Sequence, residues 1–274
     1  MGSTQSLFLT GLGPAFLAFR GSARQPDPPP ASQAEHALRA AIEAGNKQAL
    51  TDLGNLLSRR TGAAAEAERA FRDALEAGDG RAWIGLGNLL YKQGREGEAE
   101  EAYRAAADAG YPGGWLGVGA LLAQQRGRER EAEQVFRDAL HSGWVETGDI
   151  GTLWRNLGHT LRNDKSRWDE TEAAYREAIK AGDDRSWHDL GWLLEKQPGR
   201  EHEAESAYRV AIETGATEAL LDLSMLLFRL KGREHEAKTI YLQAVQAGHA
   251  LPLPRVLKLA AAVKARLRRA RGGD

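Results

Sequence analysis

The chain of 274 residues contains no cysteine and only 9 prolines. Without cysteine it can form no disulfide framework, no thiolate zinc site and no cysteine nucleophile. No excess of one charge sign is present either, because the formal net charge is -1, and 42% of the residues are hydrophobic. This composition excludes general disorder and predicts a soluble, folded protein. The lack of cysteine fits the reducing cytoplasm best.

The short motifs of common enzyme classes are also missing. The sequence has no G-x-x-x-x-G-K-[ST] phosphate loop, no H-E-x-x-H zinc motif and no G-x-S-x-G nucleophile elbow. His202 and His235 occupy the same place in two repeated GREHEA turns, which indicates a repeat position rather than metal ligation. The carboxylates of the EAE runs are expected on solvated faces. We therefore expect no enzyme activity, no cofactor and no metal.

What the sequence does contain is one repeated unit. An Ala-Glu dipeptide, or a close variant, recurs in steps of 33, 32, 33, 39, 33 and 33 residues. In each copy an apolar or aromatic residue follows the first dipeptide residue after four positions, and a glycine follows it after eleven. The seven copies begin at Ala34, Ala67, Ala99, Ala132, Thr171, Ala204 and Ala237. Two amphipathic helical patterns in each repeat predict a solenoid, in which each repeat buries its apolar face against its neighbours.

The residues that define the repeat have mechanical roles in a helix pair. In the second helix of one pair, Ala99, Tyr103 and Ala106 recur at helical spacing and predict a buried stripe. Gly110 follows where a left-handed residue would end the helix. In the first helix, Gly87 is expected to face the small residue of the dipeptide, so that the two helices approach closely. The first helices are expected near residues 48–60, 80–92, 113–125, 151–163, 185–196 and 217–229.

These residues carry a family resemblance. The series Trp83, Leu86, Gly87, Ala99, Tyr103 and Ala106 resembles the tetratricopeptide pattern of W, L and G followed by A, F or Y, and A. The period of 33 residues and the glycine ending of the second helix are similar to Sel1-like repeats. The resemblance covers about residues 33–248. It implies an all-α fold, a right-handed α-solenoid of antiparallel helix pairs, and a role in holding proteins or peptides.

Three segments are predicted. Residues 1–32 form an N-terminal arm with a Pro-rich linker, 33–249 the repeat array, and 250–274 a capping helix with a basic tail. The apolar run SLFLTGLGPAFLAF in the arm is too short for a confident membrane span. A partner-binding arm, a signal peptide and an N-terminal lipid anchor, suggested by MGSTQS, are alternatives for it.

The C-terminal segment differs from the array in charge. Residues 250–274 carry a net charge of +6, which leaves about -7 for the rest of the chain. Its apolar residues are expected to cover the end of the stack, and its distal half is rich in arginine. The apolar residues are Val256, Leu257, Leu259, Ala260 and Val263.

In tetratricopeptide folds the first helices line a concave groove, so the resemblance implies which residues face it. These are the residues one, five and eight positions after the site of Trp83. The candidate partner-binding residues are Asn55, Asn88, Tyr91, Arg155, His159, Arg162, His188 and Trp192. Trp192 is either a partner anchor or a residue packed against an adjacent helix, because Trp187 already fills the core site. The cluster of Arg155, His159, Arg162, His188 and Trp192 suits an acidic or aromatic peptide.

One known ligand mode of the family can be compared with these positions. A carboxylate clamp needs Lys and Asn at set groove sites; Asn55 matches one of them. Thr51 stands where Lys is needed, and Gly113 and Gly117 replace a basic pair. We therefore do not expect a carboxylate clamp.

The step of 39 residues marks an insertion, WVETGDIGTL, which is expected as a loop. Trp144 in this insertion is either a recognition residue or a staple against the solenoid.

Together these patterns predict a non-enzymatic scaffold or adaptor that binds a protein or peptide partner in its groove. The alternative is a regulator that contacts nucleic acid or an anionic membrane through the basic C-terminal helix, and steep salt dependence would distinguish it. Nucleic acid is not the expected partner, because no DNA-binding motif is present and the array is acidic. No transmembrane segment is expected. The sequence leaves the partner's identity and the oligomeric state open.

Overall fold

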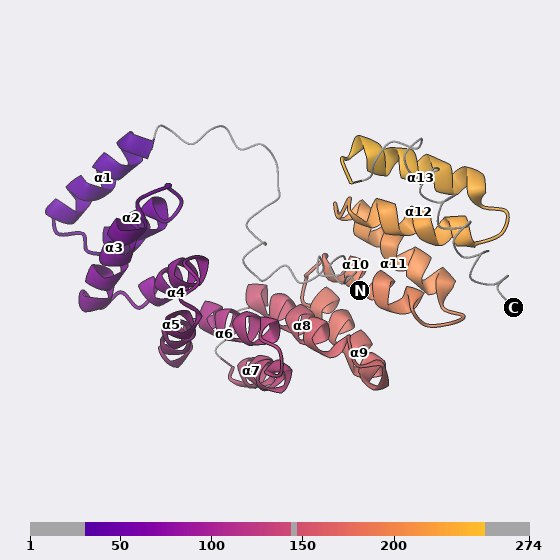
Figure 1. Ribbon diagram of the computed structural model, residues 1–274, viewed down its shortest axis with the longest axis horizontal. Helices are drawn as coiled ribbons and strands as arrows, with labels where there is room; N and C mark the ends of the chain where they lie inside the picture. Colours follow the sequence, from indigo (N-terminus) through magenta and orange to yellow (C-terminus); the bar gives the residue numbers. More distant parts are fainter. Residues whose placement is uncertain (1–30, 144–146, 250–274) are drawn as a thin grey trace, which may run out of the picture. The chain divides into compact units, whose positions relative to one another are not determined.

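The computed structural model describes residues 31–143 and 147–249 (Figure 1). The N-terminal arm up to residue 30, Trp144 and the C-terminal segment 250–274 lie outside the described residues. The first helices of the pairs are α2 (Ala49–Leu57), α4 (Ala82–Lys92), α6 (Pro112–Gln124), α8 (Thr147–Leu161), α10 (Ser186–Glu195) and α12 (Ala219–Arg229). The second helices are α1 (Ala31–Glu43), α3 (Ala64–Glu76), α5 (Glu96–Asp108), α7 (Glu129–His141), α9 (Trp168–Lys180), α11 (Glu201–Glu213) and α13 (Glu234–Gln246).

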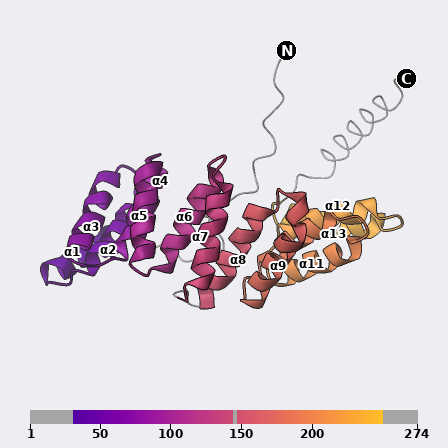
Figure 2. The same cartoon turned by 90° about the horizontal axis from the view of Figure 1, so that it is seen from below.

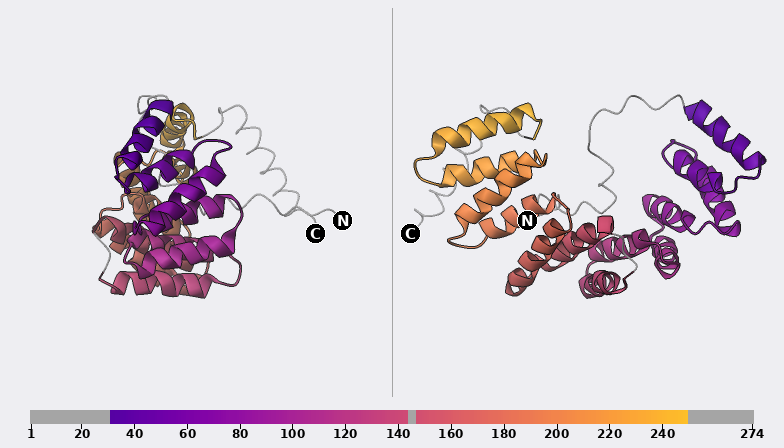
Figure 3. Two further views of the ribbon diagram at one scale, coloured as in Figure 1. Left: turned by 90° about the vertical axis from the view of Figure 1, so that its left-hand side faces the viewer. Right: turned by 180° about the vertical axis from the view of Figure 1, so that it is seen from behind.

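The chain divides into two compact units, the first ending at Ala174 and the second beginning at Tyr175 within α9. In each unit a first helix packs against the second helix of its own pair, and that second helix packs against the next first helix. Figure 2 shows these pairs of the first unit, and α11, α12 and α13 of the second unit lie side by side in both Figure 1 and the right-hand view of Figure 3. No strand occurs in the described parts of the chain. The predicted all-α solenoid of helix pairs is confirmed.

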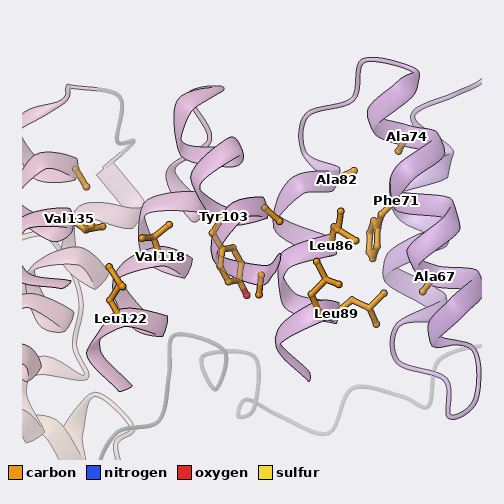
Figure 4. Packing of buried hydrophobic residues seen from close by; sticks show 14 of the residues in the cluster. Ala67, Phe71, Ala74, Ala82, Leu86, Leu89, Tyr103, Val118, Leu122 and Val135 are labelled. Atoms are coloured by element: carbon orange, nitrogen blue, oxygen red, sulfur yellow. The ribbon is translucent and has the colours of Figure 1, made fainter. Parts of the chain in front are cut away.

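The buried stripe of the second helices forms the core, as predicted. Ala99 and Ala106 are 0% exposed and Tyr103 is 1% exposed. Figure 4 shows Phe71, the equivalent of Tyr103 in the preceding repeat, with Leu86 of the next first helix pointing toward its ring. The buried aromatic residues at this site are Phe71, Tyr103, Phe136, Tyr175, Tyr208 and Tyr241. In the first copy Leu38 takes this place and is half-buried.

Two glycine positions fix the geometry of each pair. Gly110 has a φ of 82°, the left-handed conformation that ends α5, as predicted. At Gly87, a Cβ atom would lie 2.6 Å from Cε1 of Tyr103. The glycine therefore makes room for the aromatic ring of its own pair, whereas the sequence predicted that it faces the small residue Ala99.

The insertion differs from the predicted loop. Helix α8 begins at Thr147, so most of the insertion is helical. Gly151 is buried and Leu153 is 0% exposed in the core of the first unit. The extra residues therefore extend the apolar face of the first helix instead of leaving it.

Successive repeats are joined by ion pairs between the dipeptide glutamate and two arginines. The two oxygens of Glu133 lie 2.7 Å from Nη1 and Nη2 of Arg167, which precedes the next second helix, and Glu133 also pairs with Arg137 on its own helix. We call this arrangement the ion-pair ladder. The same pairing joins Glu35 to Arg60, Glu68 to Arg95, Glu100 to Arg128 and Glu205 to Arg233.

The ladder glutamates are not on solvated faces, so that prediction was wrong for them. Glu35, Glu133 and Glu205 are buried, with exposed fractions of 7%, 9% and 9%. The hydrogen bond from Arg167 lowers the pKa of Glu133, although burial opposes the shift. Partners on both sides keep this carboxylate ionised. The ladder explains why glutamate follows the small residue of the repeat.

Candidate protein-interaction surface

The first helices form one surface in each unit, which we call the inner face. Helix α2 contacts α4, α4 contacts α6 and α6 contacts α8 in the first unit, and α10 contacts α12 in the second. We number each first helix from the site of Trp83 as position 0. Position 0 is occupied by Leu50, Trp83, Trp115, Trp154, Trp187 and Leu220. The predicted groove residues are then at positions 1, 5 and 8.

Side chains at positions 1 and 8 bridge to the next first helix. The hydroxyl of Tyr91, at position 8, donates to Oε1 of Gln124 at position 9 of α6, 2.6 Å away. In the second unit Glu195, also at position 8, pairs with Arg229 at position 9 of α12. His188, at position 1, has Nε2 2.7 Å from Oδ2 of Asp222 at position 2. These two positions therefore hold neighbouring helices together in addition to lining the surface.

The residues at position 5 differ in exposure from helix to helix. Asn55 is exposed there, whereas Ala120 is only 6% exposed. Asn88 is half-buried, and its Oδ1 accepts a hydrogen bond from the Tyr103 hydroxyl at 2.8 Å. At position 1, Thr51 is 4% exposed and donates to Asp79 at 2.8 Å, so it does not line an accessible groove.

On α8, Arg155, His159 and Arg162 are half-buried at positions 1, 5 and 8. Their spacing of four and three residues places them along one side of the helix. Two guanidinium groups and an imidazole therefore lie along one helical stripe of the inner face in the first unit. Such a stripe can accept a carboxylate or an aromatic ring from a partner.

In the second unit, His188 is tied into the surface. Its ring centroid lies 5.8 Å from that of Tyr208, which donates to Oε2 of Glu195 at 2.7 Å. Burial lowers the pKa of His188, but its hydrogen bond to the Asp222 carboxylate and the nearby charges of Asp189, Asp222 and Glu218 raise it by more, so the net shift of the pKa is upward. Through its contact with Asp222, His188 joins α10 to α12.

Trp192 and Met225 occupy position 5 of the two first helices in the second unit. Trp192 is half-buried, and Nζ of Lys196 lies 5.5 Å from its ring centroid. Met225 is 51% exposed and Phe228, at position 8 of α12, is 38% exposed. The repeat spacing predicted that Met225 and Phe228 face the groove, although they were not among the candidate partner-binding residues. The signal for them was present, because both are large apolar residues at inner-face positions.

The predicted cluster is divided between the two units. Arg155, His159 and Arg162 belong to the first unit, and His188 and Trp192 belong to the second. Their joint action on one ligand stays a prediction. Within residues 31–143 and 147–249, no three His, Asp or Glu side chains gather as metal ligands. None of the helices described there has the length and apolarity to cross a bilayer.

Comparison with known proteins agrees with the geometry. The family model described as "Tetratricopeptide repeat" matches residues 53–114 and 84–147. A Sel1 repeat protein from Oxalobacter formigenes is similar in structure, with a TM-score of 0.55 and 20% identity over 80% of this chain and 100% of that one. A protective antigen of uropathogenic Escherichia coli with an SLR fold has a TM-score of 0.56 and 18% identity over 78% of this chain and 49% of that one.

A third similar structure is the human IFIT1 dimer with PPP-AAAA, with a TM-score of 0.54 and 16% identity over 89% of this chain and 60% of that one. No curated protein matches the sequence significantly. The resemblance to tetratricopeptide repeats is confirmed by the family model for residues 53–147. The similar structures, which include Sel1 repeat proteins, show the same fold. Repeats of this kind generally serve as protein-interaction scaffolds and are typically non-catalytic.

Proposed function

We propose that this chain is a non-enzymatic adaptor that binds a protein or peptide partner on its inner face. The observation that carries the proposal is the exposure of Met225, which is 51% exposed at position 5, on the helix next to Trp192. Large apolar side chains on a surface of otherwise bridged polar residues are typical of interaction sites. The cationic stripe of α8 adds a second contact of different chemistry.

Each unit suits a different group of a partner: the second an apolar or aromatic anchor, and the first an acidic group. The anchor would meet Trp192 and Met225, and the acidic group would meet Arg155 and Arg162. Methionine adapts its shape to different apolar partners, and arginine binds carboxylates with two hydrogen bonds. Asn55, Asn88 and Tyr91 extend the proposed contact surface toward the start of the array.

Affinity capture with mass spectrometry would identify the partner, and titration with purified partner would then measure binding. Trp192→Ala and Arg155→Glu should each weaken binding at least tenfold, about 1.4 kcal/mol. Met225→Ala should act in the same direction. Leu242→Glu is the matched control, because Leu242 is 48% exposed on the second helix α13. Unchanged binding by folded Trp192→Ala and Arg155→Glu proteins would refute this surface as the site.

The alternative function, contact of the basic C-terminal segment with nucleic acid or an anionic membrane, concerns residues outside those described. Nothing in the described structure favours it. Raising salt from about 50 to 200 mM should weaken such binding steeply, whereas a partner held by Trp192 and Met225 should respond much less. A cytoplasmic location is part of the proposal and rests on the absence of cysteine; cell fractionation would test it.

A further inference from the structure

The last helix pair ends the array with exposed apolar side chains. Phe228 stands at position 8 of α12 and is 38% exposed. The other residues at position 8 are Ser58, Tyr91, Ala123, Arg162 and Glu195, and each is half-buried. Because position 8 faces the next first helix, as the contact between Tyr91 and Gln124 shows, Phe228 faces the place where a following first helix would lie.

The second helix of this pair shows the same lack of cover. Ile240 of α13 is half-buried. The equivalent residues of earlier second helices are Ala70, Ala102, Val135, Ala174 and Ala207, none more than 9% exposed. Phe228 and Ile240 therefore lie on the two helices of the last pair, α12 and α13, which pack together, and each is less covered than its equivalents in earlier repeats.

The ion-pair ladder stops at this end. Lys238 replaces the ladder glutamate, and Leu242 replaces the arginine four residues later. A lysine at this place cannot accept a hydrogen bond from the arginine that precedes the following second helix. Its positive charge would also repel that arginine. The end of the array is therefore unsuited to another complete helix pair.

The chain leaves α13 in a position to cover this surface itself. Nε2 of His249 lies 2.7 Å from Oγ1 of Thr217, which precedes α12. His249, the last residue of this segment that the structure describes, therefore lies beside the N-terminal end of α12. A helix that begins here and runs parallel to α12 would follow the course of every first helix in the array. The remaining 25 residues are more than such a helix needs, since the described first helices have between 9 and 15.

The sequence after His249 fits a first helix but not a pair. Leu253 follows Gly248 by five residues, as Trp187 follows Gly182. Val256, Leu259 and Ala260 then fall at positions 3, 6 and 7, the apolar core positions of the first helices. Pro252 and Pro254 fall in the first turn, where proline is tolerated.

Position 4 carries the clearest difference from the other repeats. Gly87 at this position makes room for Tyr103 of its own second helix, but Leu257 occupies it in the C-terminal segment. A leucine side chain would collide with such a ring. It fits only a first helix that has no second helix packed on that side.

We propose that residues 253–263 dock on the apolar end formed by Phe228 and Ile240 as a single first-type helix, with Ala262 at position 9 packed against Phe228. The inference goes beyond the adaptor function and does not depend on it. It assigns a defined register to a cap that the sequence only indicated in general terms. It also ends the array after this helix, because Lys238 and Leu257 both oppose another pair.

Disulfide trapping tests the register, since the full chain has no cysteine of its own. The double variant Phe228→Cys with Ala262→Cys should close an intramolecular disulfide under mild oxidation at low micromolar protein. The control is Leu242→Cys with Ala262→Cys, because Leu242 lies at an outward ladder position. The first pair should close about tenfold faster than the control, as the docked helix raises the effective concentration of one thiol near the other.

Equal closure rates of the two pairs would overturn the proposed register. Disulfide-linked dimers of the single variant Phe228→Cys, without closure of the double variant, would show that a second copy covers this surface instead. Hydrogen exchange gives an independent measurement in case the cysteines perturb the contact. Leu259→Asp should speed exchange in α12 and α13 about tenfold, whereas Lys258→Asp at position 5 should not. No difference between these two variants would also overturn the proposal.

Discussion

Replacing Glu133 by glutamine should lower the free energy of unfolding by about 2 kcal/mol. The structure sets this magnitude between two limits. Exposed ion pairs contribute up to about 1 kcal/mol, and removing one partner of a buried pair costs about 3–5 kcal/mol. The side chain of Glu133 is 11% exposed, but those of Arg167 and Arg137 are 27% and 39% exposed. Glu133→Gln removes a buried carboxylate, whereas the two arginines that remain are partly hydrated. The expected loss of unfolding free energy therefore lies between these limits.

Urea unfolding followed by circular dichroism at neutral pH measures this loss. Glu131→Gln is the matched control, because it removes one negative charge from the same helix, where Glu131 is 52% exposed and pairs with Arg128. Its unfolding midpoint should stay close to that of the parent protein. If Glu133→Gln shifts the midpoint no more than Glu131→Gln, the ladder does not stabilise the junction between repeats, and the reasoning from burial is wrong.

The pH dependence provides a second check on the ladder. The folded pKa of Glu133 is lowered below 4.5, chiefly by the hydrogen bond from Arg167, with burial opposing the shift. A lowered pKa stabilises the folded state above pH 4.5, and this contribution is lost as the pH falls through the folded pKa. The difference in unfolding free energy between parent and Glu133→Gln should therefore be constant near neutrality and shrink in acid. A difference that stays constant below pH 4 would refute an ionic origin.

The remaining predictions concern the core and the inner face. Tyr103→Ala should destabilise the protein by about 3–5 kcal/mol, because it leaves a cavity in the core. An unchanged melting temperature would contradict a core role for Tyr103. Gly87→Ala should cost about 1–3 kcal/mol through collision with that ring, whereas Gly97→Ala, with no atom near its added Cβ, should not destabilise. His188→Gln should destabilise most below pH 6.5, and its effect should fade as the pH rises through the raised pKa of His188; an effect that grows with pH would contradict the pairing with Asp222.

The helix pairs could be predicted because their signals are local. Helical spacing of Ala99, Tyr103 and Ala106 defines a buried stripe without knowledge of the partner helix. Gly110 ends the helix through its own backbone conformation. Helix α8 begins at Thr147, four residues before the predicted start near residue 151, because Ile150 and Leu153 continue the apolar pattern of the helix into the insertion. A repeat insertion is not always a loop.

The ladder and the accessible groove positions depend on contacts between repeats, which explains why they were harder to predict. Glu133 meets Arg167 across 34 residues, and no local pattern links the two. Tyr91 and His188 were predicted as groove residues, yet both bridge to a neighbouring first helix. The sequence indicates that these side chains lie on the inner face. Only the packing of adjacent helices shows that each already makes a hydrogen bond to a neighbouring first helix.

The two kinds of repeated position in this chain answer to different constraints. The ladder keeps glutamate and arginine from repeat to repeat, because each pair must join the same two helices in the same geometry. Position 5 of the inner face changes along the array, through Asn55, Asn88, Ala120, His159, Trp192 and Met225. Asn88 accepts a hydrogen bond from Tyr103 of its own pair, but no such bond within the pair accounts for the thioether of Met225, which is 51% exposed. The proposed contact with a partner would give a reason for these residues, and Trp192 and Met225 are where that contact should be sought.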